Sequence, residues 1–392
     1  MHRSHYDVGI IGSGIAGAAL ATALTRQGFT VALLDRRPGL LDTARGDHIQ
    51  PGVQPLLERW GVLESLMLAG AEKRYGTRWL DGEGNHIVTI PVPDHPECPP
   101  YFLFLNHEQI GEVLLSRATQ AGARSVTNVS HWSIERGNGH WTVNWKQAED
   151  IGEFDCTLLV GADGTASSVR RTLKMDIERH RYQYPIAVLY GQLRDVPERR
   201  TLDVFVTADR IVSMIPRTGG ESKLGLPIAS EELPFWRDQP EDVLRSRLAQ
   251  WCPQLEFEHV SFGDIYPPVS QQSKTYTGQG AAVLIGDARH AMHPARSMGM
   301  NTCFRVAGQL AECLNILSSG FSESEVLPVL STFEASFSRT LAPQIAENHA
   351  AGLQMDTLSG GGFPQLLAQL RGAAESPKVL QSMALRAAGV ES

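Results

Sequence analysis

A glycine-rich turn near the start of the chain constrains the fold more than any other feature. Residues 7–11 form an apolar run typical of a buried parallel strand, and the pattern GxGxxG of Gly12, Gly14 and Gly17 follows at once. Residues 18–24 then have the composition of a helix that packs on a sheet. In such a unit the first glycine permits the tight turn, the second admits a pyrophosphate, and the third lets helix and strand pack closely.

A second predicted strand, residues 29–34, ends at Asp35. An acid about 20 residues after the glycines is placed to accept hydrogen bonds from ribose hydroxyls, while the helix N-terminus favours the pyrophosphate. The alternative is a glycine-rich turn in an ordinary α/β protein. That alternative requires the first strand, the glycines, the helix, the second strand and the terminal acid to coincide by chance. We predict that a dinucleotide is bound by Gly12, Gly14, Ala16, Gly17, Asp35 and Arg36.

Two later segments repeat the pattern of a buried strand that ends in glycine and aspartate. Residues 157–160 lead into Gly161 and then Asp163-Gly164, and residues 282–285 lead into Gly286-Asp287. A carboxylate at the end of a strand can accept a hydrogen bond from a ribityl hydroxyl, and the adjacent glycine lets the cofactor approach. The three elements, in this order, indicate FAD held along its whole length. After the third come His290, His293 and Pro294, and then a predicted helix that follows Gly299, Met300 and Asn301. We predict that these last three residues bind the cofactor, because a helix N-terminus aimed at the flavin would stabilise negative charge on the reduced ring.

Composition excludes several other classes of protein. The chain has 392 residues, a hydrophobic content of 42% and a formal net charge of −8, and it has no basic block that would attract nucleic acid. There is no run of about 18 uninterrupted apolar residues, so we expect no transmembrane segment. Scattered cysteines without a CxxC pair argue against a metal site or disulfides and favour a reducing cytoplasm. They are Cys98, Cys156, Cys252, Cys303 and Cys313.

Two different patterns of predicted secondary structure along the chain indicate an α/β fold. In this fold a Rossmann-like domain is interrupted by a mostly antiparallel β domain. Strands and helices alternate through residues 1–72, 100–180 and 269–358, which we assign to a discontinuous FAD-binding domain. Residues 181–268 instead have strands with alternating apolar positions, and residues 73–99 are expected to join them in a substrate-binding domain. A glycine run at 360–362 lies at the start of a predicted C-terminal helical tail, residues 359–392.

These motifs resemble those of the single-component (group A) flavoprotein aromatic hydroxylases, the family that includes p-hydroxybenzoate hydroxylase. The resemblance covers nearly the whole chain and includes the stretch 45–51. It implies that Arg45 lies along the FAD pyrophosphate, that Asp163-Gly164 serves both FAD and NAD(P)H, and that Asp287 binds the ribitol. Within the family, the chain is most similar to the branch that includes quinolone-pathway monooxygenases.

The resemblance also implies the chemistry. NAD(P)H reduces FAD, O₂ adds to the reduced flavin, and a C4a-hydroperoxide transfers one oxygen atom to an electron-rich aromatic or heteroaromatic ring. The protein must bring the substrate to the flavin and keep water away. Histidines are the obvious candidates for the base that removes a phenol proton, so we predict His290 and His293 as catalytic residues. Pro294 is predicted with them because it lies in the stretch expected beside the isoalloxazine. The alternative for each histidine is a polar packing role near the binding site.

Departures from the family pattern keep alternatives open. Arg289 stands where the family has alanine, residues 297–299 replace GQG, and Arg305-Val306 replace a Glu-Asp pair. One alternative is another flavin oxidoreductase, either halogenase-like or a reductase, although the tryptophan motif of halogenases is missing. Another is a scaffold that holds FAD without turnover. The substrate, the choice between NADH and NADPH, and the oligomeric state are left open.

Overall fold

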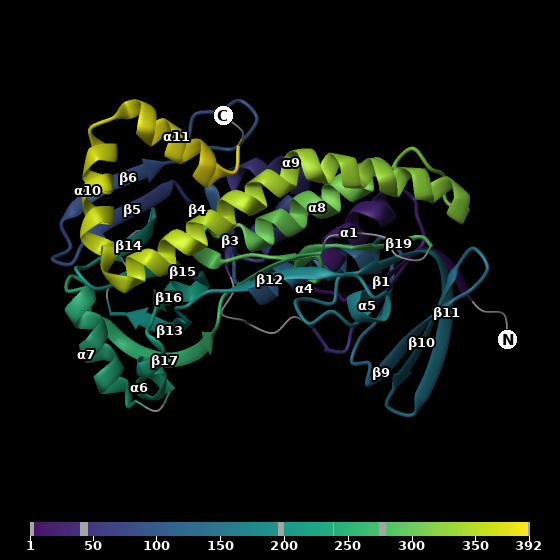
Figure 1. Ribbon diagram of the computed structural model, residues 1–392, viewed down its shortest axis with the longest axis horizontal. Coiled ribbons are helices and arrows are strands. Elements are labelled where there is room, and N and C mark those ends of the chain that lie inside the picture. Colours follow the sequence, from purple (N-terminus) through teal and green to yellow (C-terminus); the bar gives the residue numbers. More distant parts are fainter. Residues whose placement is uncertain (1–3, 40–45, 195–199, 238, 274–279, 391–392) are drawn as a thin grey trace.

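A mostly parallel sheet forms one end of the molecule and carries the glycine-rich turn (Figure 1). The computed structural model describes residues 4–39, 46–194, 200–237, 239–273 and 280–390. The spatial order of the strands is β8 (Arg124–Val126), β2 (Val31–Leu34), β1 (Ser4–Ile11), β11 (Asp150–Gly161), β10 (Trp141–Gln147) and β9 (His131–Arg136). Strand β19 (Ala282–Leu284) also pairs with β11. Four of these strands, β2, β1, β11 and β19, run parallel. The three glycine motifs follow the C-terminal ends of β1, β11 and β19, and they therefore lie at the same edge of the sheet.

Helices cover this sheet and bury its central strands. The first is α1 (Ile15–Arg26), which packs against α4 (His107–Gln120) and α8 (Gly299–Leu314). Helix α9 (Glu323–Thr357) lies along α8. Because β1 is covered, its residues Val8 and Ile10 are fully buried. Shorter helices on the periphery are α2 (Gln54–Arg59), α3 (Leu63–Leu68) and α5 (Ser168–Thr172).

A second large sheet lies at the other end of the molecule (Figure 1). Its order is β17 (Phe257–Tyr266), β13 (Ile186–Leu193), β16 (Glu221–Pro227), β15 (Ile211–Pro216), β14 (Leu202–Val206), β5 (Gly76–Asp81) and β6 (His86–Pro91). All neighbours are antiparallel except β14 and β5. The predicted strands of this region are present, but two helices within it were not predicted. Helices α6 (Leu233–Arg237) and α7 (Glu241–Trp251) cover one face.

Two three-stranded sheets lie between the large ones. One contains β3 (His48–Ile49), β7 (Phe102–Phe104) and β4 (Glu72–Arg74). The other contains β12 (Ile177–Arg181), β18 (Val269–Ser273) and β20 (His290–Ala291). Strand β12 leads the chain into the second large sheet, and β18 leads it back. The predicted fold class is confirmed by this architecture, whereas the exact domain boundaries stay a prediction.

The C-terminal helices fold back over the second sheet. After α9, Gly361 takes φ +117° and the chain reverses into α10 (Phe363–Ala374) and α11 (Pro377–Ala388). Both helices contact β6 (Figure 1). Two hydrogen bonds attach the end of the tail to the first sheet's helices and loops: Gln50 Nε2 donates to Ala387 O at 3.1 Å, and Arg305 donates to Gly389 O at 2.6 Å. Arg305, a departure from the family pattern, therefore holds the tail in place.

None of the helices in the described part of the chain combines the length and the apolar composition that a membrane crossing requires.

Candidate active site

One cavity joins the glycine motifs to the second large sheet. Its volume is about 2230 Å³, whereas a site for one drug-sized ligand has roughly 300–1,000 Å³. Residues from both large sheets, from the segment after β19 and from the C-terminal helices line it. The space is therefore large enough for a dinucleotide and a second molecule together.

The glycines of the first motif meet three different requirements. Gly12 has φ +108°, and a Cβ there would lie 2.3 Å from Ala162 O. A Cβ on Gly17 would lie 1.9 Å from Gly12 O, so this glycine is needed for packing. A Cβ on Gly14 would meet nothing within 4 Å among the described residues, yet Gly14 lines the cavity at the N-terminus of α1. That open cradle beside helix N–H groups fits the pyrophosphate of FAD.

Asp35 holds the glycine turn in place. Its Oδ2 accepts hydrogen bonds from Ser13 N at 2.7 Å and Ser13 Oγ at 3.1 Å, and its Oδ1 accepts one from Arg37 N at 2.8 Å. Asp35 and Arg36 both line the cavity. The carboxylate is thus oriented at the cavity wall, where the sequence predicts the ribose.

The second motif is connected to the third through an arginine that the sequence analysis did not single out as functional. Asp163 Oδ2 accepts hydrogen bonds from Ser168 N at 2.6 Å and Val169 N at 3.1 Å, which caps α5. On that helix, Arg170 donates to Ala288 O at 2.7 Å and to Thr165 O at 2.9 Å. Because its targets are backbone carbonyls, no sequence pattern reveals this link.

Gly286 and Asp287 have separate roles at the third motif. Gly286 has φ +57°, and a Cβ there would lie 2.6 Å from the Cβ of Ala16, so glycine permits close packing. The next residue, Asp287, lines the cavity, and Gln271 Nε2 donates to its backbone oxygen at 2.8 Å. Asp287 is therefore fixed at the wall where a ribityl chain is expected.

Asn301 acts through the backbone rather than at the cavity wall. Its Oδ1 accepts a hydrogen bond from Gln50 N at 2.9 Å, and its Nδ2 donates to His48 O and Ser297 O, both at 3.1 Å. The side chain ties the segment 48–50 to the start of α8. We infer that it positions the wall of the site.

The structure places most of the predicted cofactor residues at the cavity. Those that line it are Gly12, Gly14, Ala16, Asp35, Arg36, Asp163, Gly164, Asp287, Gly299 and Met300. Those described but outside the lining are Gly17, Gly286 and Asn301, which pack or position the others. Arg45 lies outside the described residues.

Of the predicted catalytic residues, His293 and Pro294 line the cavity. His293 Nδ1 accepts a hydrogen bond from Ala295 N at 3.0 Å, and burial lowers the pKa of His293 to about 4. The ring is therefore neutral near pH 7, with its proton on Nε2. Tyr182 packs edge-on against it, with ring centroids 4.5 Å apart.

His290 lies away from the cavity lining. It is 1% exposed and packs near Phe337, and neither ring nitrogen has a hydrogen-bond partner among the described residues. Burial lowers the pKa of His290 to about 4. The structure thus brings two of the three predicted catalytic residues together and keeps His290 in the core.

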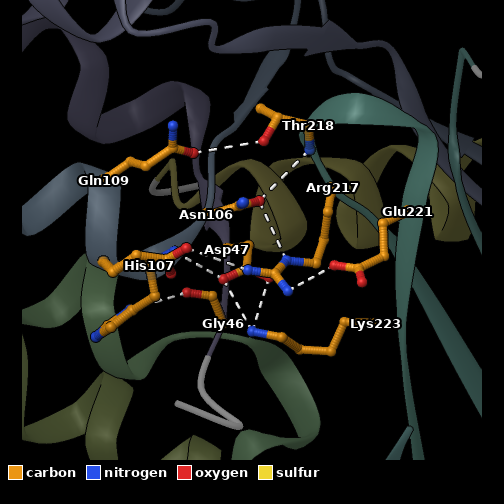
Figure 2. Close-up of polar contacts among 10 residues, drawn as sticks. Gly46, Asp47, Asn106, His107, Gln109, Arg217, Thr218, Glu221 and Lys223 are labelled. Carbon is orange, nitrogen blue, oxygen red and sulfur yellow. Dashed lines mark hydrogen bonds and ion pairs between the residues drawn. The ribbon is translucent and has the colours of Figure 1, made fainter. Parts of the chain in front are cut away.

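A buried ion cluster joins the first sheet's loops to the second sheet (Figure 2). Lys223 Nζ lies 2.8 Å from Asp47 Oδ2, and Arg217 Nε lies 3.6 Å from the same oxygen. His107 N donates to Asp47 Oδ1 at 3.0 Å. Burial raises the pKa of Asp47, while Lys223 and Arg217 act to lower it. The sequence offers one signal, a lysine directly before the apolar residues 224–227, but it does not show which residue pairs with that lysine.

Comparison with known proteins identifies the family. A family model described as an FAD binding domain matches residues 5–336. The chain belongs to this family. The predicted FAD cofactor and the predicted resemblance to flavoprotein aromatic hydroxylases are confirmed.

Relatives among characterised enzymes are similar over most of the chain. 6-Hydroxynicotinate 3-monooxygenase of Pseudomonas fluorescens is 24% identical over 328 residues, which cover 78% of this chain and 82% of that enzyme. Kynurenine 3-monooxygenase of Xanthomonas campestris pv. campestris (strain 8004) is 27% identical over 365 residues, covering 83% and 74%. The named relatives are monooxygenases.

Solved structures share the fold at lower identity. p-Nitrophenol 4-monooxygenase PnpA from Pseudomonas putida DLL-E4 has a TM-score of 0.81 at 16% identity over 100% of both chains. PqsL, a probable FAD-dependent monooxygenase from Pseudomonas aeruginosa, has a TM-score of 0.73 at 21% identity, covering 95% of this chain and 100% of its own.

Proposed function

We propose that this chain is an FAD-dependent monooxygenase that uses O₂ and NAD(P)H to insert one oxygen atom into an aromatic or heteroaromatic small molecule. The observation that carries the proposal is the shared cavity. It brings the open cradle at Gly14 and the Asp287 carboxylate into one space with the face of the second sheet. When bound, FAD supplies the activation of O₂ at the expense of NAD(P)H.

The chain's own residues bind the cofactor and enclose the substrate. The backbone at Gly14 and the N-terminus of α1 receive the pyrophosphate, and Asp35 and Asp287 accept hydrogen bonds from hydroxyls. The second large sheet supplies an apolar surface, which Val188 on β13, Val204 on β14 and Ile215 on β15 help to form. The C-terminal helices close one side of it and keep water out.

His293 is proposed to act as a hydrogen-bond donor rather than as a base. Its Nδ1 is already engaged with Ala295 N, and its low pKa keeps the ring neutral near pH 7. The atom that remains for a bound molecule is Nε2, which carries the proton. His293 therefore orients an acceptor atom in the cavity.

The reducing cytoplasm is the proposed compartment. All five cysteines are free thiols, which suits a reducing environment. NAD(P)H supply there matches the proposed reaction.

The test is NAD(P)H oxidation by the purified, FAD-loaded protein with and without phenols, anilines and quinolones. We expect at least one aromatic compound to stimulate NADH or NADPH oxidation together with O₂ consumption. A yellow protein that never oxidises either nicotinamide with any compound would contradict the proposal and favour a scaffold.

A further inference from the structure

The cavity floor on the second sheet is built by alternate residues of β16. Lys223, Gly225 and Pro227 line the cavity, whereas Leu224 and Leu226 are buried on the opposite face in the core beneath α6 and α7. This is the period of two expected of a strand. A glycine therefore occupies the middle cavity-facing position of β16.

Gly225 is not required by the protein's own backbone or packing. Its φ lies outside the positive range that favours glycine, and a Cβ would meet only Ile186 Cγ2, at 4.0 Å. By contrast, a Cβ on Gly191 in neighbouring β13 would lie 2.7 Å from the Phe257 ring. Because glycine weakens a strand interior, a position without such a need indicates close approach by another molecule.

The neighbouring strands make Gly225 the bottom of a notch. Val188 on β13 and Ser213 on β15 are its direct partners, and both line the cavity. With strands about 4.8 Å apart, the two flanking Cα atoms are about 10 Å apart. We call the surface of Val188, Gly225 and Ser213 the Gly225 notch. It is apolar on one side and has a hydroxyl on the other.

The notch lies on an open part of the sheet face. Asp264 on β17 pairs with Val188 and also lines the cavity, so an anionic group at the notch would face a carboxylate. Helices α10 and α11 pack against the β14, β5 and β6 part of the same face, where Trp79, Ile90 and Val204 still line the cavity. The cation nearest along the strand, Lys223, is paired with Asp47 at 2.8 Å. An anionic group at the notch would therefore have to compete with a buried carboxylate for that ammonium.

We propose that Gly225 is a specificity-determining residue, and that the notch receives an uncharged planar aromatic ring of the substrate. Val188 packs against the ring, and the Ser213 hydroxyl lies within reach of a ring substituent. This inference rests on the proposed function only in that the bound ring is taken to belong to the substrate. Its binding test is independent of turnover.

The experiment titrates oxidised, FAD-loaded protein with 1-naphthol, without NAD(P)H, and follows the flavin absorbance to obtain Kd. Gly225→Val places three carbons in the notch, so we expect 1-naphthol to bind roughly 10- to 100-fold more weakly, as in an overpacked site. Gly225→Ala, with one added carbon, should have a smaller effect and serves if the valine variant fails to fold. Thermal stability and FAD content should be unchanged, since a Cβ has room and valine favours strands.

Gly372→Ala is the matched control. Gly372 lies on α10 outside the cavity lining, and a Cβ there would also meet nothing within 4 Å. It should leave the Kd for 1-naphthol unchanged. Parent protein should also bind 1-naphthoate, the charged analogue, more weakly than 1-naphthol.

Equal Kd values for 1-naphthol in the parent and Gly225→Val would overturn the proposal, as would a parent that does not bind 1-naphthol. Tighter binding of 1-naphthoate would overturn the uncharged character of the notch. If the proposed function alone fails, 1-naphthol binding and its loss in Gly225→Val persist without any NAD(P)H-dependent reaction.

Discussion

The two ends of the cavity use glycine for different reasons. At the cofactor end, Gly12 and Gly17 would clash with backbone oxygens if they carried a Cβ, so the protein itself requires them. At the substrate end, a Cβ on Gly225 would meet one carbon at an ordinary contact distance. The comparison separates glycines that shape the chain from glycines that leave room for a ligand. Gly14 belongs to the second group although it lies in the first motif.

The buried ion cluster between the two ends is where we expect a substitution to lower stability most. Asp47 is fully buried and pairs with Lys223 and Arg217. In Asp47→Asn the two cations lose that buried charge, so we expect the free energy of unfolding to fall by about 3–5 kcal/mol. Chemical denaturation of the FAD-loaded protein measures it.

Glu221→Gln is the control for this ion cluster. Glu221 also pairs with Arg217, at 2.8 Å, but its side chain is 39% exposed. A loss below about 1 kcal/mol is expected for such a pair. Equal losses in the two variants would show that burial of Asp47 has no special role.

Gly14→Val sharpens the distinction between the two kinds of glycine. The added side chain fills the cradle where the pyrophosphate is expected, and we expect FAD binding to weaken by about 3 kcal/mol, or more than a hundredfold. Since a Cβ meets nothing within 4 Å, the circular dichroism spectrum should be preserved. Flavin content per purified chain is the measurement. Normal flavin content would remove the basis for the cofactor assignment.

Asp287→Ala tests the carboxylate at the same wall. Loss of a hydrogen bond to a charged group should weaken FAD binding by roughly 1.5–3 kcal/mol. Equilibrium titration of the apoprotein with FAD gives the dissociation constant. An unchanged FAD dissociation constant would show that Asp287 makes no hydrogen bond with the ribityl chain.

His290, which lies in the core outside the cavity lining, is expected to have a smaller, pH-dependent effect on the free energy of unfolding. Its folded pKa is about 4, below the usual 6.5, so the unfolded chain binds more protons between these values. Stability is therefore unaffected above pH 6.5 and falls as the pH decreases from 6.5 towards 4. His290→Leu should remove about 2 kcal/mol of the loss seen on going from pH 7.5 to pH 5. Urea denaturation at both pH values measures it, with exposed His131→Leu as a control that should leave the loss unchanged.

The cofactor end could be predicted from the sequence because its constraints are local. A strand, three glycines and an acid lie close together in the chain, and each glycine meets a backbone requirement or leaves a cradle. The fold class followed from the same local patterns. The roles of the individual residues toward FAD remain predictions.

The substrate end could not be predicted in the same way, because its contacts join distant residues. Asp47 and Lys223 are 176 positions apart, and Gly225 acquires its meaning only beside Val188 and Ser213. Helices α6 and α7 were missed because the surrounding strand pattern dominates residues 181–268. His290 and His293 have the same residue type, and only tertiary packing places one in the core and the other at the cavity.

We propose that one cavity holds FAD and an aromatic substrate together for oxygen transfer. The most direct measurement is turnover under ¹⁸O₂ with NAD(P)H and an aromatic compound that stimulates its oxidation. We expect a product that carries one ¹⁸O atom, with the second ¹⁸O atom released as water. Unlabelled product, or labelled hydrogen peroxide with no oxygenated product from any stimulating compound, would contradict it.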